Sequence, residues 1–173
     1  MRLIRTFYGH TGKMSSANFS HFGNSIVTSS LDKTIRVWDF ATGICLKTIN
    51  CNDKEITAAY YSNDDKYIIS CENENCIKVW DAETGSLFRS ITDKSFIGLF
   101  FISLNPINNC IVSGAVSSIK IWDFITGKCL KSLSVPNDAV NAVFSPDGKY
   151  IAVSFILKNK IRIYNLQSGT FIK

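Results

Sequence analysis

Three polar residues in the first part of the chain have the types that a catalytic triad needs. Thr28 offers a hydroxyl, His10 an imidazole and Asp32 a carboxylate, the set that activates a hydroxyl nucleophile through a general base. However, the chain has only two histidines, and it contains no phosphate-binding, dinucleotide-binding, zinc-protease or nucleophile-elbow motif. We therefore expect a protein without enzymatic activity, in which these three residues have a structural role.

The six cysteines do not form a metal-binding pattern. A structural zinc site uses about four converging thiolate or imidazole ligands, usually in close pairs along the sequence. No C-x-x-C pair occurs, and Cys71 and Cys76 are the nearest pair. Free cysteine behaves as a small buried hydrophobe. We expect reduced structural thiols, and neither a metal nor a cofactor.

Composition indicates a folded chain with an apolar core. Of the 173 residues, 46% are hydrophobic and 19% are charged. No apolar run approaches the roughly 20 residues that span a bilayer, and the densest one, 96–104, is better explained as a buried strand. The first ten residues contain no apolar segment of the kind found in signal peptides. We expect a cytoplasmic or nuclear protein that does not enter a membrane.

A repeat at one fixed spacing organises the chain. Trp38, Trp80 and Trp122 are each 42 positions apart, and the same step leads to Tyr164. The next residue is an aspartate or its amide in each case: Asp39, Asp81, Asp123 and Asn165. A Thr-Gly or Ser-Gly pair begins three residues later. Self-similarity at a fixed period of this length indicates an array of one supersecondary unit.

Each repeat predicts four short strands. Stretches such as Ile35–Trp38 alternate with a period of two and are rich in β-branched residues. Turn residues precede a second apolar segment such as Tyr67–Ser70, and further strands such as Ile56–Tyr61 and Leu87–Ile91 lie on either side. No segment keeps a 3.6-residue period for ten residues, so we expect no helix. A sheet with two apolar faces needs a neighbour on each side, which radial packing as propeller blades provides.

The repeat resembles the WD-repeat (β-transducin-like) propeller family. The segments that carry the resemblance are IRVWDFATG, IKVWDAETG, IKIWDFITG and the degenerate IRIYNLQSG, together with Gly9-His10 at the start of the first repeat. The resemblance covers essentially the whole chain. It implies an all-β fold of blades with four antiparallel strands each, and a function in binding.

The same resemblance implies a hydrogen-bonded tetrad of His10, Thr28, Asp32 and Trp38 in the first blade. A carboxylate that accepts from an imidazole makes a charge-assisted bond, and a buried indole N–H needs a partner. The later repeats lack the histidine, and their aspartate position holds other residues: Glu74, Val116 and Lys158. We expect a full tetrad only in the first blade, and apolar packing without it in the third and fourth.

We divide the single propeller region, 1–173, into a leading outer strand and four repeats: 1–9, 10–50, 51–92, 93–134 and 135–173, the last truncated in its outer strand. Leu3–Phe7 aligns with Cys45–Ile49 as an outer strand, although the fourth repeat enters an outer strand of its own. Leu3–Phe7 and the outer strand of the fourth repeat would then compete for the same outer edge of the last blade. A partial or open propeller is the favoured outcome, and a closed four-bladed ring, a piece of a longer array and a ring of two paired chains are the alternatives.

The expected function is that of a protein-interaction scaffold, a subunit of a larger complex that binds proteins or peptides on the loop face of the blades. Candidate partner-binding residues lie in loops between blades and in turns before the Trp strands: Lys13, Leu31, Lys54, Asn73, Phe96, Leu157 and Lys158. Self-association, or blades supplied by a longer chain, would complete an open array. A scaffold subunit of a chromatin modifier is one form that this function could take.

A net charge of +5 supports one alternative, an RNA-associated subunit of an RNA-processing or ribosome-assembly particle. The lysines near predicted turns are Lys13, Lys33, Lys54, Lys94, Lys158 and Lys160. They are spread through the repeats and form no basic run, so the sequence favours a protein partner over RNA.

Overall fold

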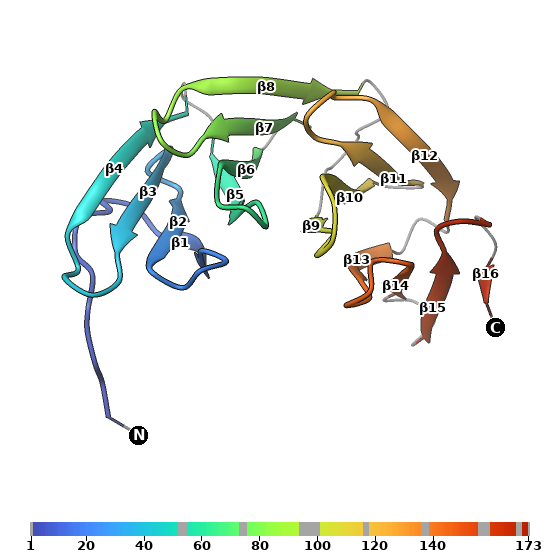
Figure 1. Ribbon diagram of the computed structural model, residues 1–173, viewed down its shortest axis with the longest axis horizontal. Coiled ribbons are helices and arrows are strands. Elements are labelled where there is room, and N and C mark those ends of the chain that lie inside the picture. Colours follow the sequence, from blue (N-terminus) through green and yellow to red (C-terminus); the bar gives the residue numbers. More distant parts are fainter. Residues whose placement is uncertain are drawn as a thin grey trace. The chain divides into compact units, whose positions relative to one another are not determined.

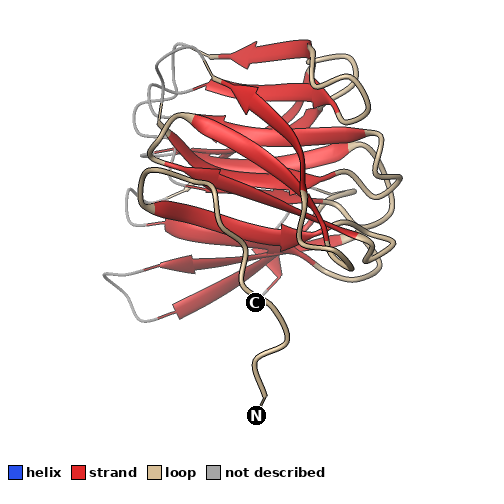
Figure 2. Cartoon of the chain, turned by 90° about the vertical axis from the view of Figure 1, so that its left-hand side faces the viewer, coloured by secondary structure: helices blue, strands red, loops and turns tan. Residues whose placement is uncertain are grey.

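Strands are the only regular elements that the described residues form (Figure 2). The computed structural model describes residues 2–51, 55–72, 76–93, 101–115, 118–135, 139–155, 160–168 and 171–172. Within these ranges there are sixteen strands. No helix in this part of the chain is long and apolar enough to cross a membrane.

The sixteen strands form four sheets, each built from four consecutive strands, and every pair with a defined register is antiparallel (Figure 1). Blade 1 comprises β1 (Met14–Phe19), β2 (Ser25–Ser30), β3 (Thr34–Asp39) and β4 (Cys45–Asn50). Blade 2 comprises β5 (Ile56–Tyr61), β6 (Tyr67–Glu72), β7 (Cys76–Asp81) and β8 (Leu87–Thr92). Blade 3 comprises β9 (Phe101–Leu104), β10 (Cys110–Ala115), β11 (Ser118–Asp123) and β12 (Cys129–Ser134). Blade 4 comprises β13 (Ala139–Phe144), β14 (Tyr150–Phe155), β15 (Lys160–Asn165) and β16 (Phe171–Ile172).

The prediction of an all-β fold with four strands per repeat is confirmed. The predicted strand Ile56–Tyr61 is β5, and Leu87–Ile91 is β8 with one more residue. Of the predicted buried strand 96–104, the last four residues form β9, and residues 96–100 lie outside the described part of the chain. The period-two pattern explains this agreement, because alternation places one set of side chains in each sheet's core.

The expected leading strand is a point of difference. Residues 2–9 form no strand, although Leu3–Phe7 aligns with the outer strand β4. The segment joins no hydrogen-bonded ladder and is held by side chains instead. The Arg5 guanidinium donates to the carbonyl oxygens of Thr42 (2.8 Å) and Ala41 (2.6 Å), and the Phe7 ring meets Trp38 edge-on with centroids 5.8 Å apart.

The chain forms two compact units, each with a core between two sheets. In the first unit, residues 1–73 and 77–88, Ile35 and Ile49 of blade 1 pack with Ile56, Ile68 and Trp80 of blade 2. In the second unit, residues 74–76 and 89–173, the core joins blades 3 and 4 through buried residues from both sheets: Val112, Ile119, Ile121, Ile151, Val153 and Tyr164. Burial of these aliphatic side chains is the main force that holds each pair of sheets together.

Blade 4 differs from the others in the exposure of its third strand. Ile35, Ile77 and Ile119 occupy one repeat position and are fully buried, whereas Ile161 at the same position is 71% exposed. Two residues further along the strand, Ile163 is 44% exposed. One face of blade 4 therefore presents aliphatic side chains to solvent.

Candidate partner-binding grooves

The structure brings His10, Thr28, Asp32 and Trp38 together in one hydrogen-bonded chain inside blade 1. The Trp38 indole N–H donates to Thr28 Oγ1 at 2.7 Å, and Thr28 Oγ1 lies 2.8 Å from His10 Nε2. His10 Nδ1 lies 2.7 Å from Asp32 Oδ2. This order assigns the proton of a neutral His10 to Nδ1, because Nε2 then accepts from the threonine hydroxyl.

Asp32 is the best-connected member of this network. Its carboxylate also accepts from the hydroxyl of Thr34 at 2.7 Å and from the backbone N–H of Thr11 at 3.0 Å. Burial alone would raise the pKa of Asp32, but hydrogen bonds from Thr34, His10 and Thr11 outweigh it and hold the pKa well below its ordinary value. The side chains of His10 and Asp32 are only 5% and 6% exposed. Thr28 Oγ1 contacts Trp38, His10 and, at 3.4 Å, the carbonyl oxygen of Arg36, so the geometry is that of a structural network.

Two later blades keep the inner half of this network. The Trp80 indole N–H donates to Ser70 Oγ, and the Trp122 indole N–H donates to Ser113 Oγ, each at 2.9 Å. The expectation that blade 3 relies on apolar packing alone is therefore wrong. A buried indole N–H needs an acceptor, and the adjacent strand supplies a serine hydroxyl.

A column of cations contacts the turns that follow the third strands. The residues are 42 positions apart: Arg5, Lys47, Arg89 and Lys131. Each cation donates to at least one backbone carbonyl in the turn that follows the next third strand, which ends in Trp-Asp or, in the fourth repeat, in Tyr-Asn. Besides Arg5, described above, Lys47 Nζ reaches the oxygens of Ala82 (3.0 Å) and Glu83, and Arg89 Nε reaches that of Ile125 at 2.7 Å. Lys131 Nζ lies 2.5 Å from Leu166 O and 3.4 Å from Gln167 O.

Next to this column, a groove of about 520 Å³ runs between blades 1 and 2, and we call it groove A. Val37 lies buried among its lining residues, Leu46 and Tyr67 come from the two blades, and Phe22 stands 72% exposed. The Asp65 carboxylate crosses between the blades and accepts from the backbone N–H groups of His21 (2.7 Å) and Phe22 (3.2 Å). Three acidic residues line groove A: Asp65, Asp81 and Glu83.

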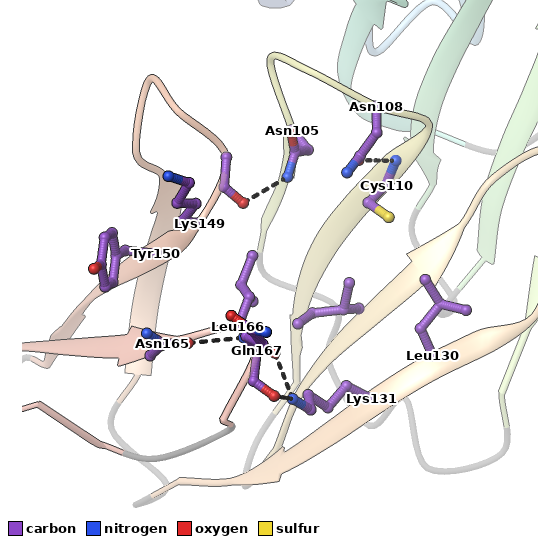
Figure 3. Close-up of a pocket in the computed structure, with 12 residues that line it drawn as sticks. Asn105, Asn108, Cys110, Leu130, Lys131, Lys149, Tyr150, Asn165, Leu166 and Gln167 are labelled. Carbon is purple, nitrogen blue, oxygen red and sulfur yellow. Dashed lines mark hydrogen bonds between the residues drawn. The ribbon is translucent and has the colours of Figure 1, made fainter.

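A second groove of about 590 Å³, groove B, lies at the equivalent place between blades 3 and 4 (Figure 3). Leu130 and Lys131 come from β12, and Lys149 and Tyr150 come from the other blade. The buried Asn105 side chain connects the turn between β9 and β10 to the turn between β13 and β14. Its Nδ2 donates to Gly148 O at 3.1 Å.

Gly148 allows the close approach of these two turns. Its φ is +68°, and a Cβ built on it would lie 2.6 Å from Asn105 Oδ1. A side chain would therefore clash with Asn105 and strain the backbone. Figure 3 also shows Lys131 reaching the backbone of Leu166 and Gln167 in the turn after β15, where Asn165 is bonded to Gln167.

Of the seven partner-binding candidates predicted from the sequence, two lie in the described part of the chain. Leu31 and Lys13 are both exposed, and the structure brings them together, because the Leu31 N–H donates to Lys13 O at 2.9 Å. The other five lie outside the described residues: Lys54, Asn73, Phe96, Leu157 and Lys158. None of the seven lines groove A or groove B as the described residues define them.

Sequence reasoning missed the grooves, but the repeat contained a usable signal. Stepping by 42 from Lys47 finds a cation in every repeat, and stepping by 42 from Leu46 finds an apolar residue, Phe88 and then Leu130. Leu46 is 56% and Leu130 55% exposed. An exposed apolar residue beside a cation at a fixed repeat position indicates a surface that recurs between blades.

Four-stranded antiparallel sheets that recur at a fixed spacing, with Trp-Asp at the end of the third strand, define a β-propeller repeat protein. The chain belongs to the WD40 family. The family model for the WD domain, G-beta repeat, matches residues 1–39, 43–81 and 127–165. Residues 82–126 lie outside the three matches. These residues nevertheless contain β9, β10 and β11, which form with β12 a sheet of the same strand order as the others.

Curated relatives match the chain over short segments. COMPASS component SWD3 of Saccharomyces cerevisiae is 38% identical over 56 residues, which is 32% of this chain and 18% of the relative. U3 small nucleolar RNA-associated protein 21 of the same yeast is 44% identical over 48 residues, 28% of this chain and 5% of the relative. A ribosome biogenesis protein BOP1 homolog of Drosophila grimshawi is 43% identical over 47 residues, 27% of this chain and 6% of the relative. The matches thus span less than a fifth of the length of these relatives.

Proposed function

We propose that this chain is a non-enzymatic interaction platform that contributes WD blades to a larger protein complex. The observation that carries the proposal is the pair of grooves at equivalent places in the two units. Each combines a buried aliphatic residue, an exposed leucine, a tyrosine and a lysine: Val37, Leu46, Tyr67 and Lys47 in groove A, and Ile121, Leu130, Tyr150 and Lys131 in groove B. Apolar surface with a few fixed polar groups is what a peptide segment needs for binding.

The names of the relatives support a place in a multi-subunit assembly. One is a COMPASS component and another is a ribosome biogenesis protein homolog. We propose the same general role for this chain, in the nucleus or the cytoplasm, with a chromatin-modifier scaffold as one form of it. Leu31 and Lys13 form an additional candidate contact, because they are adjacent and exposed.

An RNA-associated role is the second candidate. A relative is named a U3 small nucleolar RNA-associated protein, and the net charge of the chain is +5. Among the lysines considered from the sequence, Lys13 and Lys33 are exposed, whereas Lys160 is half-buried over the Phe155 ring. Lys54, Lys94 and Lys158 lie outside the described residues. Two exposed lysines are a weak electrostatic footprint for RNA, so the protein platform is the better-supported role.

Co-elution from cell extract tests the two roles against each other. Tagged full-length chain is purified from untreated and ribonuclease-treated extract and passed over a sizing column. A platform should co-elute with the same proteins at fixed ratios after ribonuclease treatment, whereas an RNA-dependent subunit should lose them. The protein platform is contradicted if no protein co-elutes with the folded chain above the level of a heat-unfolded sample.

A further inference from the structure

Three of the four cations contact a turn that follows a third strand ending in aspartate. The pairs by repeat position are Arg5 with Asp39, Lys47 with Asp81 and Arg89 with Asp123. Hydrogen bonds from Thr42, together with the charge of Arg5, lower the pKa of Asp39. Hydrogen bonds from Thr84, together with the charge of Lys47, lower the pKa of Asp81. A negative charge therefore faces the cation at these two positions.

The fourth repeat keeps the turn but not the charge. Asn165 occupies the aspartate position, and its Oδ1 accepts from the backbone N–H groups of Gln167 (2.8 Å) and Ser168 (3.1 Å). Asp81 Oδ1 makes the equivalent bond to the Thr84 N–H at 2.7 Å. The amide thus reproduces the geometry of the aspartate turn while it removes the carboxylate that would face Lys131.

Groove B has a more positive lining than groove A, and Asn165 contributes to the difference. Its described lining residues include two lysines, Lys131 and Lys149, and no carboxylate. Groove A also has two lysines, but it has three acidic residues beside them. Lys131 Nζ contacts two carbonyl oxygens, which accept hydrogen bonds without neutralising its charge. The rim residue Lys149 lies 4.0 Å from Asp147, and both side chains are at least half exposed, so this pair is screened by solvent.

The rest of groove B suits an extended peptide. Leu130 offers an exposed apolar contact, and the Tyr150 ring lies on the opposite side (Figure 3). The exposed side-chain amides of Asn108 and Gln167 can donate to and accept from a peptide backbone. The volume of about 590 Å³ accommodates a few residues of such a segment.

We propose that groove B binds an extended segment of a partner protein that carries an aspartate or glutamate, whose carboxylate lies beside Lys131 at the position that Asn165 leaves uncharged. The proposal rests on the proposed function and names the chemistry of one partner segment. Groove A is less suited to such a segment, because Asp81 already faces Lys47 and the three acidic residues of its lining outnumber its two lysines.

A single substitution separates this proposal from a merely structural role of the groove. Asn165→Asp restores the carboxylate of the other repeats and can accept the same two backbone hydrogen bonds, so the fold should be retained. The matched control is Asp81→Asn, which makes the opposite change in groove A. Leu130→Ala tests the apolar contact, and thermal unfolding of each variant checks that it folds.

The experiment uses the labelled full chain and an array of short capped peptides that differ only by glutamate or glutamine at one position. Wild type and Asp81→Asn should prefer glutamate over glutamine by about three- to tenfold at one position, since a partly screened ion pair contributes that much. Asn165→Asp should abolish the preference, and Leu130→Ala should weaken binding of both peptides.

Two results would overturn the proposal. One is peptide binding without a glutamate preference, or with a preference that Asn165→Asp retains. The other is no binding of any peptide to wild type, whether or not a short single-stranded RNA binds in a parallel measurement. In both cases the co-elution experiment still decides the platform function independently.

Discussion

The Trp122 indole N–H donates a hydrogen bond to Ser113 Oγ at 2.9 Å, although repeat 3 has no histidine and has Val116 at the position of Asp32. In blade 1 the corresponding bond, from Trp38 to Thr28, is continued to His10 and Asp32. The Trp–hydroxyl pair is therefore the part of the network that recurs, and the charged part is an addition in blade 1.

Ser113→Ala should destabilise the protein by about 1–3 kcal/mol, because the buried indole N–H of Trp122 is left without an acceptor. Ser70→Ala should have a similar effect through Trp80, since the geometry of the two pairs is the same. Urea unfolding followed by tryptophan fluorescence measures the loss. A Ser113→Ala variant with wild-type stability would show that water replaces the hydroxyl at no cost.

Asp32→Ala should cost about 1–3 kcal/mol of unfolding free energy or more, because it leaves the donors of His10, Thr34 and Thr11 without their acceptor. Glu83→Ala is a suitable control, since the Glu83 side chain is exposed. The measurement is the unfolding midpoint of both variants in urea. If Asp32→Ala unfolds at the same midpoint as Glu83→Ala, the network does not stabilise blade 1.

The lowered pKa of Asp32 predicts a specific pH dependence. The unfolded chain takes up the proton on this group at about pH 4, before the folded chain does. The stabilisation from the ionised carboxylate is therefore complete above about pH 4 and is lost as the pH falls towards the folded pKa. Between neutral pH and about pH 3, wild type should lose more stability than Asp32→Asn. The other aspartates contribute equally to the loss of stability in both proteins, so their contributions cancel in the comparison. An equal loss of stability in wild type and Asp32→Asn would contradict the prediction.

The fixed step between repeats was enough to predict the strands and the members of the blade 1 network, because both depend on residue type at short range. Alternation of β-branched residues determines which side chains enter a sheet, and the Trp-Asp pair marks the end of the third strand in repeats 1 to 3. The Ser113 bond was missed, because a serine one position closer to its Trp than Thr28 and Ser70 does not show in a fixed-step comparison.

The grooves were not predicted because they depend on contacts between blades. Whether Arg5 lies in a strand or in an irregular segment is decided by the partners available to it, which Leu3–Phe7 itself does not specify. Likewise, the sequence shows that Asn165 replaces an aspartate, but only the structure shows that Lys131 reaches the adjacent turn. A local pattern thus predicts the blade, and packing decides the chemistry between blades.

The cysteines should differ strongly in reactivity. Burial, together with the negative charge of Glu72, raises the pKa of Cys51 to about 12, so very little thiolate forms near neutral pH. Cys129 is exposed and all six cysteines are free thiols. Brief treatment of the folded protein with iodoacetamide, followed by mass spectrometry, should show Cys129 modified well before Cys51. Equal modification of both under native conditions would mean that the first unit opens on the time scale of the reaction.

The exposed face of blade 4 should associate with another sheet of the same kind, supplied by a second copy or by a longer chain. Ile161 and Ile163 are exposed here, whereas Ile35 and Val37 at the same positions in blade 1 are buried. Ile161→Lys places a charge in this face and should shift the protein towards a species of 19.3 kDa, because burying an unpaired charge is costly. Light scattering after gel filtration measures the mass over a range of concentrations. Ile44→Lys, at a 61% exposed position outside this face, should leave the mass distribution of wild type unchanged. If wild type has the mass of a single chain at every concentration, copies of this chain do not cover the face.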